Sequence, residues 1–231
     1  MNMKRNILLI GLATLLAMPT FAQYRPNGRY HRPYSSGYTR TASSARSSYG
    51  SPYVYCGFRF GVNGSNITSD DSYLDGDDFL SGLNAGLTLD VMLSPVTPLF
   101  LETGALYTEK GGKGYKYSNR YTYKLNYVEV PLVMKYQVKI NNHFAITPFL
   151  GGYLAGGVSG KIKDKERRES RDAFNDYDFR RFDGGLRTGC GFMLDMFYAE
   201  VGADIGLANI CNDSFDSARN NTVFANIGIN F

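Results

Sequence analysis

The amino-acid sequence predicts an all-β protein, an eight-stranded antiparallel up-and-down barrel that follows a disordered N-terminal tail. The first observation is that apolar residues recur at every second position from Tyr53 onward, the pattern of strands with one apolar and one polar face. The second is composition, because 26 glycines, 18 tyrosines and 15 phenylalanines favour strands and tight turns. The third is that no uninterrupted apolar run reaches the roughly 18 residues of a membrane-spanning helix.

The first 22 residues have the layout of a signal peptide. Lys4 and Arg5 form a basic start, and residues 7–18 form an apolar stretch that is too short to span a membrane. Small residues follow, and we expect cleavage between Ala22 and Gln23. The sequence therefore predicts export through the inner membrane.

Residues 23–52 differ in composition from the rest of the chain. They hold five arginines, five tyrosines and no acidic residue, so this segment carries a charge of +5 while the part after it carries about −3. Such a segment cannot bury an apolar core, and we expect a disordered, basic periplasmic tail. A mixture of arginine and tyrosine also suits nucleic acid, but an exported protein rarely meets nucleic acid, and we exclude that partner.

Eight segments of alternating polarity follow in residues 53–231, the predicted barrel domain, and most reach the 9–11 residues of a tilted transmembrane strand. Charged residues and glycines occupy the face opposite the apolar one. The first four segments, each with its apolar face in parentheses, are 53–63 (Val54, Cys56, Phe58, Phe60, Val62), 83–93 (Leu83, Ala85, Leu87, Leu89, Val91, Leu93), 99–110 (Leu99, Leu101, Thr103, Ala105, Tyr107) and 127–138 (Val128, Val130, Leu132, Met134, Tyr136, Val138).

In the second half of the barrel, apolar and polar residues alternate less regularly in the first segment than in the other three. Pro131 and Pro148 lie inside the fourth and fifth segments, and because proline cannot donate to a strand ladder we expect a local bulge there. The last four segments are 144–158 (Phe144, Ile146, Leu150, Leu154), 182–194 (Phe182, Leu186, Cys190, Phe192, Leu194), 197–207 (Phe197, Ala199, Val201, Ala203, Ile205, Leu207) and 223–231 (Val223, Ala225, Ile227, Ile229, Phe231).

The connections between these segments alternate between short turns and long polar loops. This asymmetry is typical of outer-membrane barrels, in which short turns face the periplasm and long loops face outward. With an even number of strands, the tail and the C-terminus both lie on the periplasmic side. The short connections are 94–98, 139–143 and the residues around Met196, and the long ones are about 64–79, 109–124, 159–181 and 209–221.

A soluble lipocalin-like binding barrel is the competing fold, because alternation alone does not say which face is inside. Two features favour the membrane barrel. The polar face carries too many charges and glycines for a dry ligand pocket, and Phe231 ends the chain in register with the apolar face. A terminal aromatic residue resembles the signal by which outer-membrane barrels reach the barrel assembly machinery, so we expect that machinery and outer-membrane lipid as partners.

The polar faces predict a network of charges in the lumen. A tight turn near Met196 sets Arg187 directly opposite Asp204, and we expect a salt bridge there, with Arg59 and Glu129 at a similar height. The alternative is that these four side chains are each hydrated and form no ion pairs.

The same turn arithmetic around Val96 sets two carboxylates against each other nearer the periplasmic mouth. These are Asp90 and Glu102, with Glu200 at the same level and Lys135 as their cation. Opposed like charges are destabilising, so we expect arginines of the tail, Arg40 or Arg46, to contact this acidic mouth.

Several stretches resemble the PorT-type outer-membrane β-barrel proteins of Bacteroidetes. Residues 57–66 (GFRFGVNGSN) resemble the opening GxxxGxNxS strand of that family, residues 107–111 (YTEKG) its YxxKG strand end, and residues 127–136 (YVEVPLVMKY) its YLEIPLLLKY strand. Residues 149–153 and 226–231 fit as well, so the resemblance covers about residues 53–231. It implies an eight-stranded barrel in the outer membrane. The founding member is associated with type IX protein secretion, and most relatives have no assigned role.

The sequence offers little for enzymatic chemistry. Barrel hydrolases pair a serine or aspartate with histidine, but His31 lies in the tail and His143 in a predicted periplasmic turn. The sequence therefore predicts no enzyme, no cofactor and no metal site. The acidic residues of the first long loop have no EF-hand spacing, and we expect them to be solvated; they are Asp70, Asp71, Asp75, Asp77 and Asp78.

Two functional classes remain. In the first, the barrel is a membrane anchor or interaction protein whose long loops or tail engage envelope proteins, including secretion proteins. In the second, it is a passive, porin-like transporter of a small solute. Because eight strands enclose a lumen just wide enough to be filled by side chains, the first class is favoured.

Overall fold

The computed structural model describes residues 54–69, 79–94, 96–116, 119–164, 170–174, 179–211 and 217–231. The predicted signal peptide and tail, with Ala22, Gln23, His31, Arg40 and Arg46, lie outside these residues, as do Asp70–Asp78 of the acidic loop. In the described part, no helix is long and apolar enough to cross a membrane. The strands are β1 (Val54–Ser69), β2 (Leu80–Met92), β3 (Leu99–Lys116), β4 (Asn119–Tyr136), β5 (Val138–Lys139), β6 (Phe144–Asp164), β7 (Ser170–Asp172), β8 (Phe182–Leu194), β9 (Phe197–Gly206) and β10 (Ala218–Asn230).

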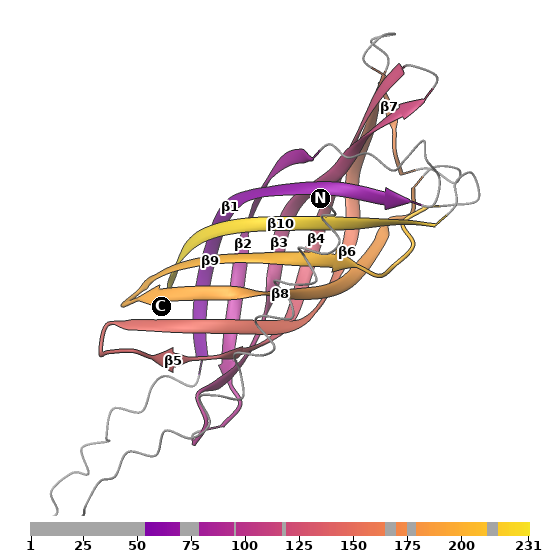
Figure 1. The fold of residues 1–231 in the computed structure, drawn as a ribbon. Coiled ribbons are helices and arrows are strands. Elements are labelled where there is room, and N and C mark those ends of the chain that lie inside the picture. The colour runs from indigo at the N-terminus through magenta and orange to yellow at the C-terminus, as the bar shows by residue number, and fades with distance from the viewer. Residues whose placement is uncertain are drawn as a thin grey trace, which may run out of the picture.

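Eight of these strands form a closed antiparallel barrel, which confirms the predicted fold class. Consecutive strands of the wall pair with each other, which includes β4 with β6 past the short β5 and β6 with β8 past the short β7, and β1 pairs with β10. The other short strand, β7, pairs with β6 beyond the barrel wall. Figure 1 shows the tilted barrel, with β7 at the top and the short turns at the opposite end.

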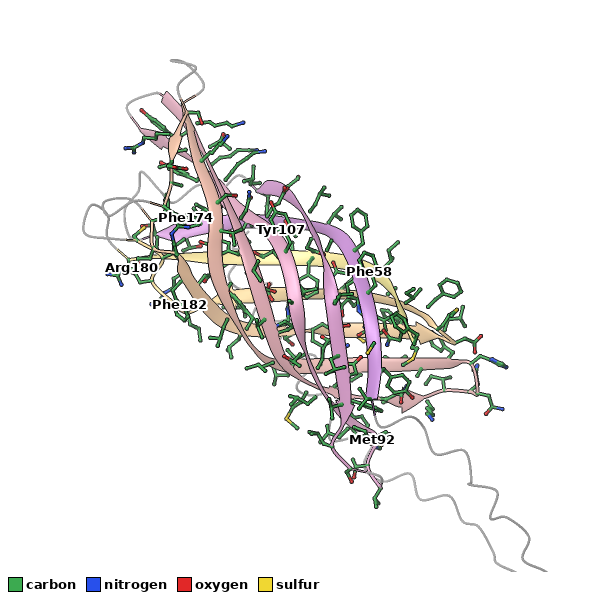
Figure 2. The ribbon with its side chains drawn as sticks, turned by 180° about the vertical axis from the view of Figure 1, so that it is seen from behind. Phe58, Met92, Tyr107, Phe174, Arg180 and Phe182 are labelled. Carbon is green, nitrogen blue, oxygen red and sulfur yellow. The ribbon has the colours of Figure 1, made fainter. Side chains whose placement is uncertain are left out.

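The apolar face of every predicted segment points outward. Strand β1 shows this most simply, because Phe58 and Phe60 are exposed while Arg59 between them is fully buried. Phe58, Tyr107 and Phe182 of the outward face are labelled in Figure 2. An apolar exterior around a polar interior is the arrangement of a barrel that sits in lipid.

The short turns lie where the sequence predicts them, but two of the long connections are strand rather than loop. Strands β3 and β4 continue to Lys116 and from Asn119, so most of residues 109–124 is a hairpin. Strand β6 likewise continues to Asp164 and pairs with β7. A polar outward face predicts a loop for these residues, but their inward face keeps its aromatic residues, and they form strands. We call residues 109–116, 119–127, 158–164 and 170–172 the arm. The end of the barrel that carries the arm is the arm end, and the end with the short turns is the turn end.

The bulge expected at the two prolines lies elsewhere. Pro131 pairs in register with Tyr153, and Pro148 with Cys190. The β4–β6 register instead shifts between Asn126 and Tyr127, where the arm leaves the barrel. The described β3–β4 ladder pairs no residues between Glu102–Val133 and Leu106–Glu129, which is the stretch opposite Pro131, so an interrupted ladder accommodates the missing donor.

Candidate functional site: the charged lumen

The inward faces of the strands bring a dense set of charged side chains together in the lumen. Strand alternation dictates this placement, because a residue between two lipid-facing residues has to point inward. The buried charged residues are Arg59, Asp90, Glu102, Lys110, Glu129, Lys135, Asp183, Arg187, Glu200 and Asp204. All eight residues predicted for the lumen network are in this set. They separate into two layers.

The turn-end layer is built around the two opposed carboxylates. Asp90 and Glu102 face each other across the β2–β3 ladder. Lys135 forms ion pairs with both, at 3.4 Å from Asp90 Oδ1 and in close contact with Glu102 Oε2. The ring of Tyr198 lies against this site, with the Lys135 Nζ atom 4.5 Å from its centroid. The cation–π contact and the ion pairs together offset the desolvation cost of burying the ammonium group.

Arg59 belongs to the turn-end layer, and the prediction that it lies level with Arg187, Asp204 and Glu129 is wrong. Its Nη2 atom is 3.9 Å from Asp90 and 3.7 Å from Glu102. The reason is the barrel's tilt, which makes residues at equal distance from their turns lie at different heights.

Arg59 also changes the charge balance on which tail docking was predicted. It donates a hydrogen bond of 2.7 Å to Asn230 Oδ1 and lies over the Tyr198 ring. It therefore supplies a second cation at the mouth, beside Lys135. Glu200 accepts a hydrogen bond of 2.7 Å from Asn226.

The arm-end layer is tighter. Arg187 lies opposite Asp204 in the β8–β9 ladder, as the turn arithmetic predicts, and donates two hydrogen bonds to it, of 2.8 Å from Nε and 3.1 Å from Nη2. The same guanidinium contacts Glu129 Oε1 at 2.8 Å. A bidentate pair of this kind fixes both side chains in one orientation.

Two members of the arm-end layer were not among the predicted site residues. Lys110 Nζ lies 2.7 Å from Glu129, 3.6 Å from Asp204 and 3.8 Å from Asp183, and 4.0 Å from the centroid of the Tyr153 ring. The signal was in the sequence, because Lys110 shares the polar face of its strand with Glu102, and Asp183 shares that of Arg187. Their heights could not be judged without the tilt of the barrel.

Apolar side chains fill the lumen between and beyond the charged layers. Val133, Phe149 and Phe224 form one buried cluster. A cavity of about 20 Å³ lies beside Lys135 and Tyr198, which is room for about one water molecule. At the arm end a larger cluster caps the barrel: Ile67, Tyr123, Leu125, Tyr127, Tyr153, Ala155, Ile162, Ala173, Phe179, Ile210, Cys211 and Ala218. The described lumen is thus packed with side chains.

Two other residues singled out in the sequence lie outside the lumen. Phe231 is exposed on the outward face, and its backbone exchanges two hydrogen bonds of 2.8 Å with Cys56. His143 is exposed in the turn before β6, where its Nδ1 atom lies 2.7 Å from Asp195. Cys56 is exposed, Cys190 is half-buried and Cys211 is buried in the cap, and no disulfide links the three.

An apolar exterior, a buried charged interior and short turns at one end define the class of protein as a transmembrane barrel of the outer membrane. The chain belongs to the outer membrane protein beta-barrel domain family, whose model matches residues 21–212. The protein is therefore an outer-membrane protein. No curated protein matches the chain in sequence.

Three solved structures are similar to this chain. Neisserial surface protein A is 14% identical, with 78% of this chain and 98% of that chain covered and a TM-score of 0.48. Ail, the attachment invasion locus protein of Yersinia pestis, in complex with the heparin analogue sucrose octasulfate, is 14% identical, with 78% and 100% covered and a TM-score of 0.41. A second Ail structure gives 14% identity, 77% and 98% coverage and a TM-score of 0.40.

Proposed function

We propose that the protein is a non-conducting, non-enzymatic anchor of the outer membrane that presents its arm to partners in the envelope. The observation that carries this proposal is the packed lumen. The side chains of Arg59 and Glu129 are completely buried, and so are Phe149 and Tyr153 at 1% and 2% exposure. A solute that passed through the barrel would have to break several buried ion pairs, and breaking one costs about 3–5 kcal/mol.

The arm is the part of the molecule suited to contact a partner. Its three long strands and β7 hold a rigid sheet beyond the apolar belt, and hydrogen-bonded sheet positions an interface better than a loop does. The described chain begins its first strand and ends its last at the turn end, opposite the arm. In the proposed orientation the turn end and the tail are periplasmic and the arm is extracellular. The PorT-type resemblance supports envelope or secretion proteins as the partners.

Planar-bilayer recording of the purified full-length protein tests the anchor role. We expect no stable conductance steps over long recordings at high salt. Stable, uniform channels would overturn the proposal and favour the porin-like alternative. A known eight-stranded barrel and an open porin, reconstituted in the same way, set the two reference levels.

Cysteine labelling on intact cells tests the orientation separately. Lys163→Cys lies on the arm and Asn141→Cys in the turn before β6, and both residues are exposed. A membrane-impermeant maleimide should label Lys163→Cys on whole cells and Asn141→Cys only after lysis. The reverse pattern would show that the barrel is inverted.

Crosslinking identifies the partner. Photoreactive groups on the arm should capture an envelope protein from native membranes, and removal of the hairpin from residues 112–123 should abolish that product. A turn-end photoreactive group at Asn141 is the matched control, because it lies at the other end of the same barrel.

A further inference from the structure

The outward wall of the arm carries four lysines on three neighbouring strands, which we call the lysine patch: Lys113, Lys124, Lys161 and Lys163. Strand register brings them together. Lys124 on β4 lies directly opposite Lys161 on β6, and Thr122 lies between Lys113 on β3 and Lys163 on β6. Their outward direction follows from alternation, because Tyr123 and Ile162 beside them are buried in the cap.

The Lys124–Lys161 pair is unfavourable for the isolated protein. Residues directly opposite in an antiparallel pair have Cβ atoms about 4.5–5.5 Å apart, and like charges there are destabilising. In the part of the chain that the structure describes, no carboxylate forms an ion pair with Lys124, Lys161 or Lys163. Three acidic residues lie near the lysine patch in the ladder. Glu109 accepts a hydrogen bond from the backbone of Leu83, Asp172 on β7 lies opposite Lys161, and Asp164 at the end of β6 lies opposite Tyr121.

The lysine patch begins directly above the apolar belt. Lys124 is four residues beyond the exposed Val128 on β4, and Lys161 is three beyond the exposed Val158 on β6. With a strand rise of about 3.3 Å and a tilt of roughly 40°, these spacings amount to about 8–10 Å along the membrane normal. The backbone of the patch therefore lies at the outer edge of the polar head groups, which add roughly 5–8 Å to each side of the hydrocarbon core, and the long lysine side chains reach into that layer.

We propose that the lysine patch binds the phosphate groups of a phosphorylated glycolipid in the outer leaflet. This inference rests on the orientation proposed above. An anion between Lys124 and Lys161 converts their repulsion into two attractions, and the acyl chains of the lipid lie against the apolar belt below. The ligand chemistry is thus a phosphate at the head-group level with covalently attached acyl chains.

Lipid binding by the folded full-length chain in dodecyl maltoside, which contains no phosphate, tests the proposal. The probes are diphosphoryl lipid A and its dephosphorylated form, and bound lipid is counted by native mass spectrometry. The wild type should prefer the phosphorylated probe. The double variant Lys124→Ser/Lys161→Ser should lose about 30-fold in affinity for it, since each lysine near a lipid surface contributes roughly fivefold.

Arg219→Ser is the matched control. Arg219 on β10 is exposed, points outward and stands four residues beyond the exposed Val223, as Lys124 stands beyond Val128, but it belongs to the other wall of the barrel. Its loss should leave the affinity for the phosphorylated probe within about twofold of the wild type, whereas each lysine of the patch contributes roughly fivefold. Equal binding of both probes by the wild type, or equal losses in the control and the double variant, would overturn the proposal. Equal affinity for phosphatidylglycerol would overturn the assignment to a glycolipid.

A reversal of sign in thermal stability gives a second readout. Without lipid, Lys124→Glu should raise the unfolding temperature by about 1–3 °C, because it replaces repulsion from Lys161 with attraction and faces Gly111 on its other side. With lipid A present the wild type should gain stability and the variant should not. A lower unfolding temperature of the variant without lipid would contradict the proposed repulsion. The conductance and labelling experiments do not depend on the patch, so their failure is distinguishable from this one.

Discussion

The two charged layers of the lumen contain similar groups but hold them differently. In the arm-end layer Arg187 and Lys110 contact Glu129 at 2.8 and 2.7 Å, and Arg187 is bidentate to Asp204. In the turn-end layer the guanidinium of Arg59 is 3.7–3.9 Å from its carboxylates, and Asp90 and Lys135 line a cavity that has room for a water molecule. The difference teaches that charge balance alone does not define a rigid lumen. Contact geometry does, and it makes the arm-end layer the tighter seal.

The largest expected effect is the loss of the arginine in the tighter layer. Arg187→Met leaves Asp204 and Glu129 buried with Lys110 as their remaining close cation, and it should lower the free energy of unfolding by about 3–5 kcal/mol. Urea unfolding of the barrel in detergent, followed by the heat-modifiable band on gels, measures the change. Arg187→Met/Asp204→Leu should recover much of the loss, because it removes the uncompensated carboxylate. A single variant as stable as the wild type would refute the ranking of the layers.

A smaller effect is expected in the looser layer. Arg59→Met removes a hydrogen bond to Asn230 and two long ion pairs, while Lys135 still contacts Asp90 and Glu102. Since hydrogen bonds to charged groups contribute about 1.5–3 kcal/mol, we expect a loss of about 2 kcal/mol in the same assay. A loss greater than that of Arg187→Met would reverse the comparison.

Overpacking tests whether the turn-end layer can yield. A Cβ atom at Gly191 would lie 2.1 Å from the Tyr198 hydroxyl and 2.4 Å from the Thr147 hydroxyl. Gly191→Ala should cost about 1–2 kcal/mol, because a packed interior resists even one added methyl group. Adding Tyr198→Phe removes one obstructing oxygen and should recover part of the cost. If the double variant is no more stable than Gly191→Ala, Tyr198 is not the obstruction.

The smallest effect concerns salt. Raising the ionic strength from about 0.1 to 1 M shortens the Debye length from about 10 to 3 Å, but buried pairs are screened little. We therefore expect the free energy of unfolding of Arg59→Met and of the wild type to change by less than about 0.5 kcal/mol each. A strong salt dependence confined to the wild type would show that the turn-end layer is open to solvent.

The sequence predicted the strands and their faces because period-two alternation reports both at once. The same rule, extended from a tight turn, gave the opposition of Arg187 to Asp204 and of Asp90 to Glu102. It failed for Arg59, whose height depends on pairing between β1 and β10, at opposite ends of the sequence. The strands of the arm could not be predicted in this way, because their outward face is polar and a polar segment without an apolar face favours a loop. Alternation along β3 identifies Lys110 as an inward residue, but the carboxylates that it contacts come from three other strands.

The seam where β1 pairs with β10 links the order of strand pairing to the burial of the Arg59 charge. Gly57 pairs with Asn230 across it, so closure is the least local contact that the strands make. Each of the other strand pairs in the wall joins neighbours along the chain, so it forms at a lower cost in loop-closure entropy. Arg59 can donate its hydrogen bond to Asn230 only after β1 has paired with β10, and in an open sheet its guanidinium remains hydrated. We therefore expect closure to come last and to dehydrate the Arg59 guanidinium, with Asp90 and Glu102 on the already paired β2 and β3 offsetting part of that cost.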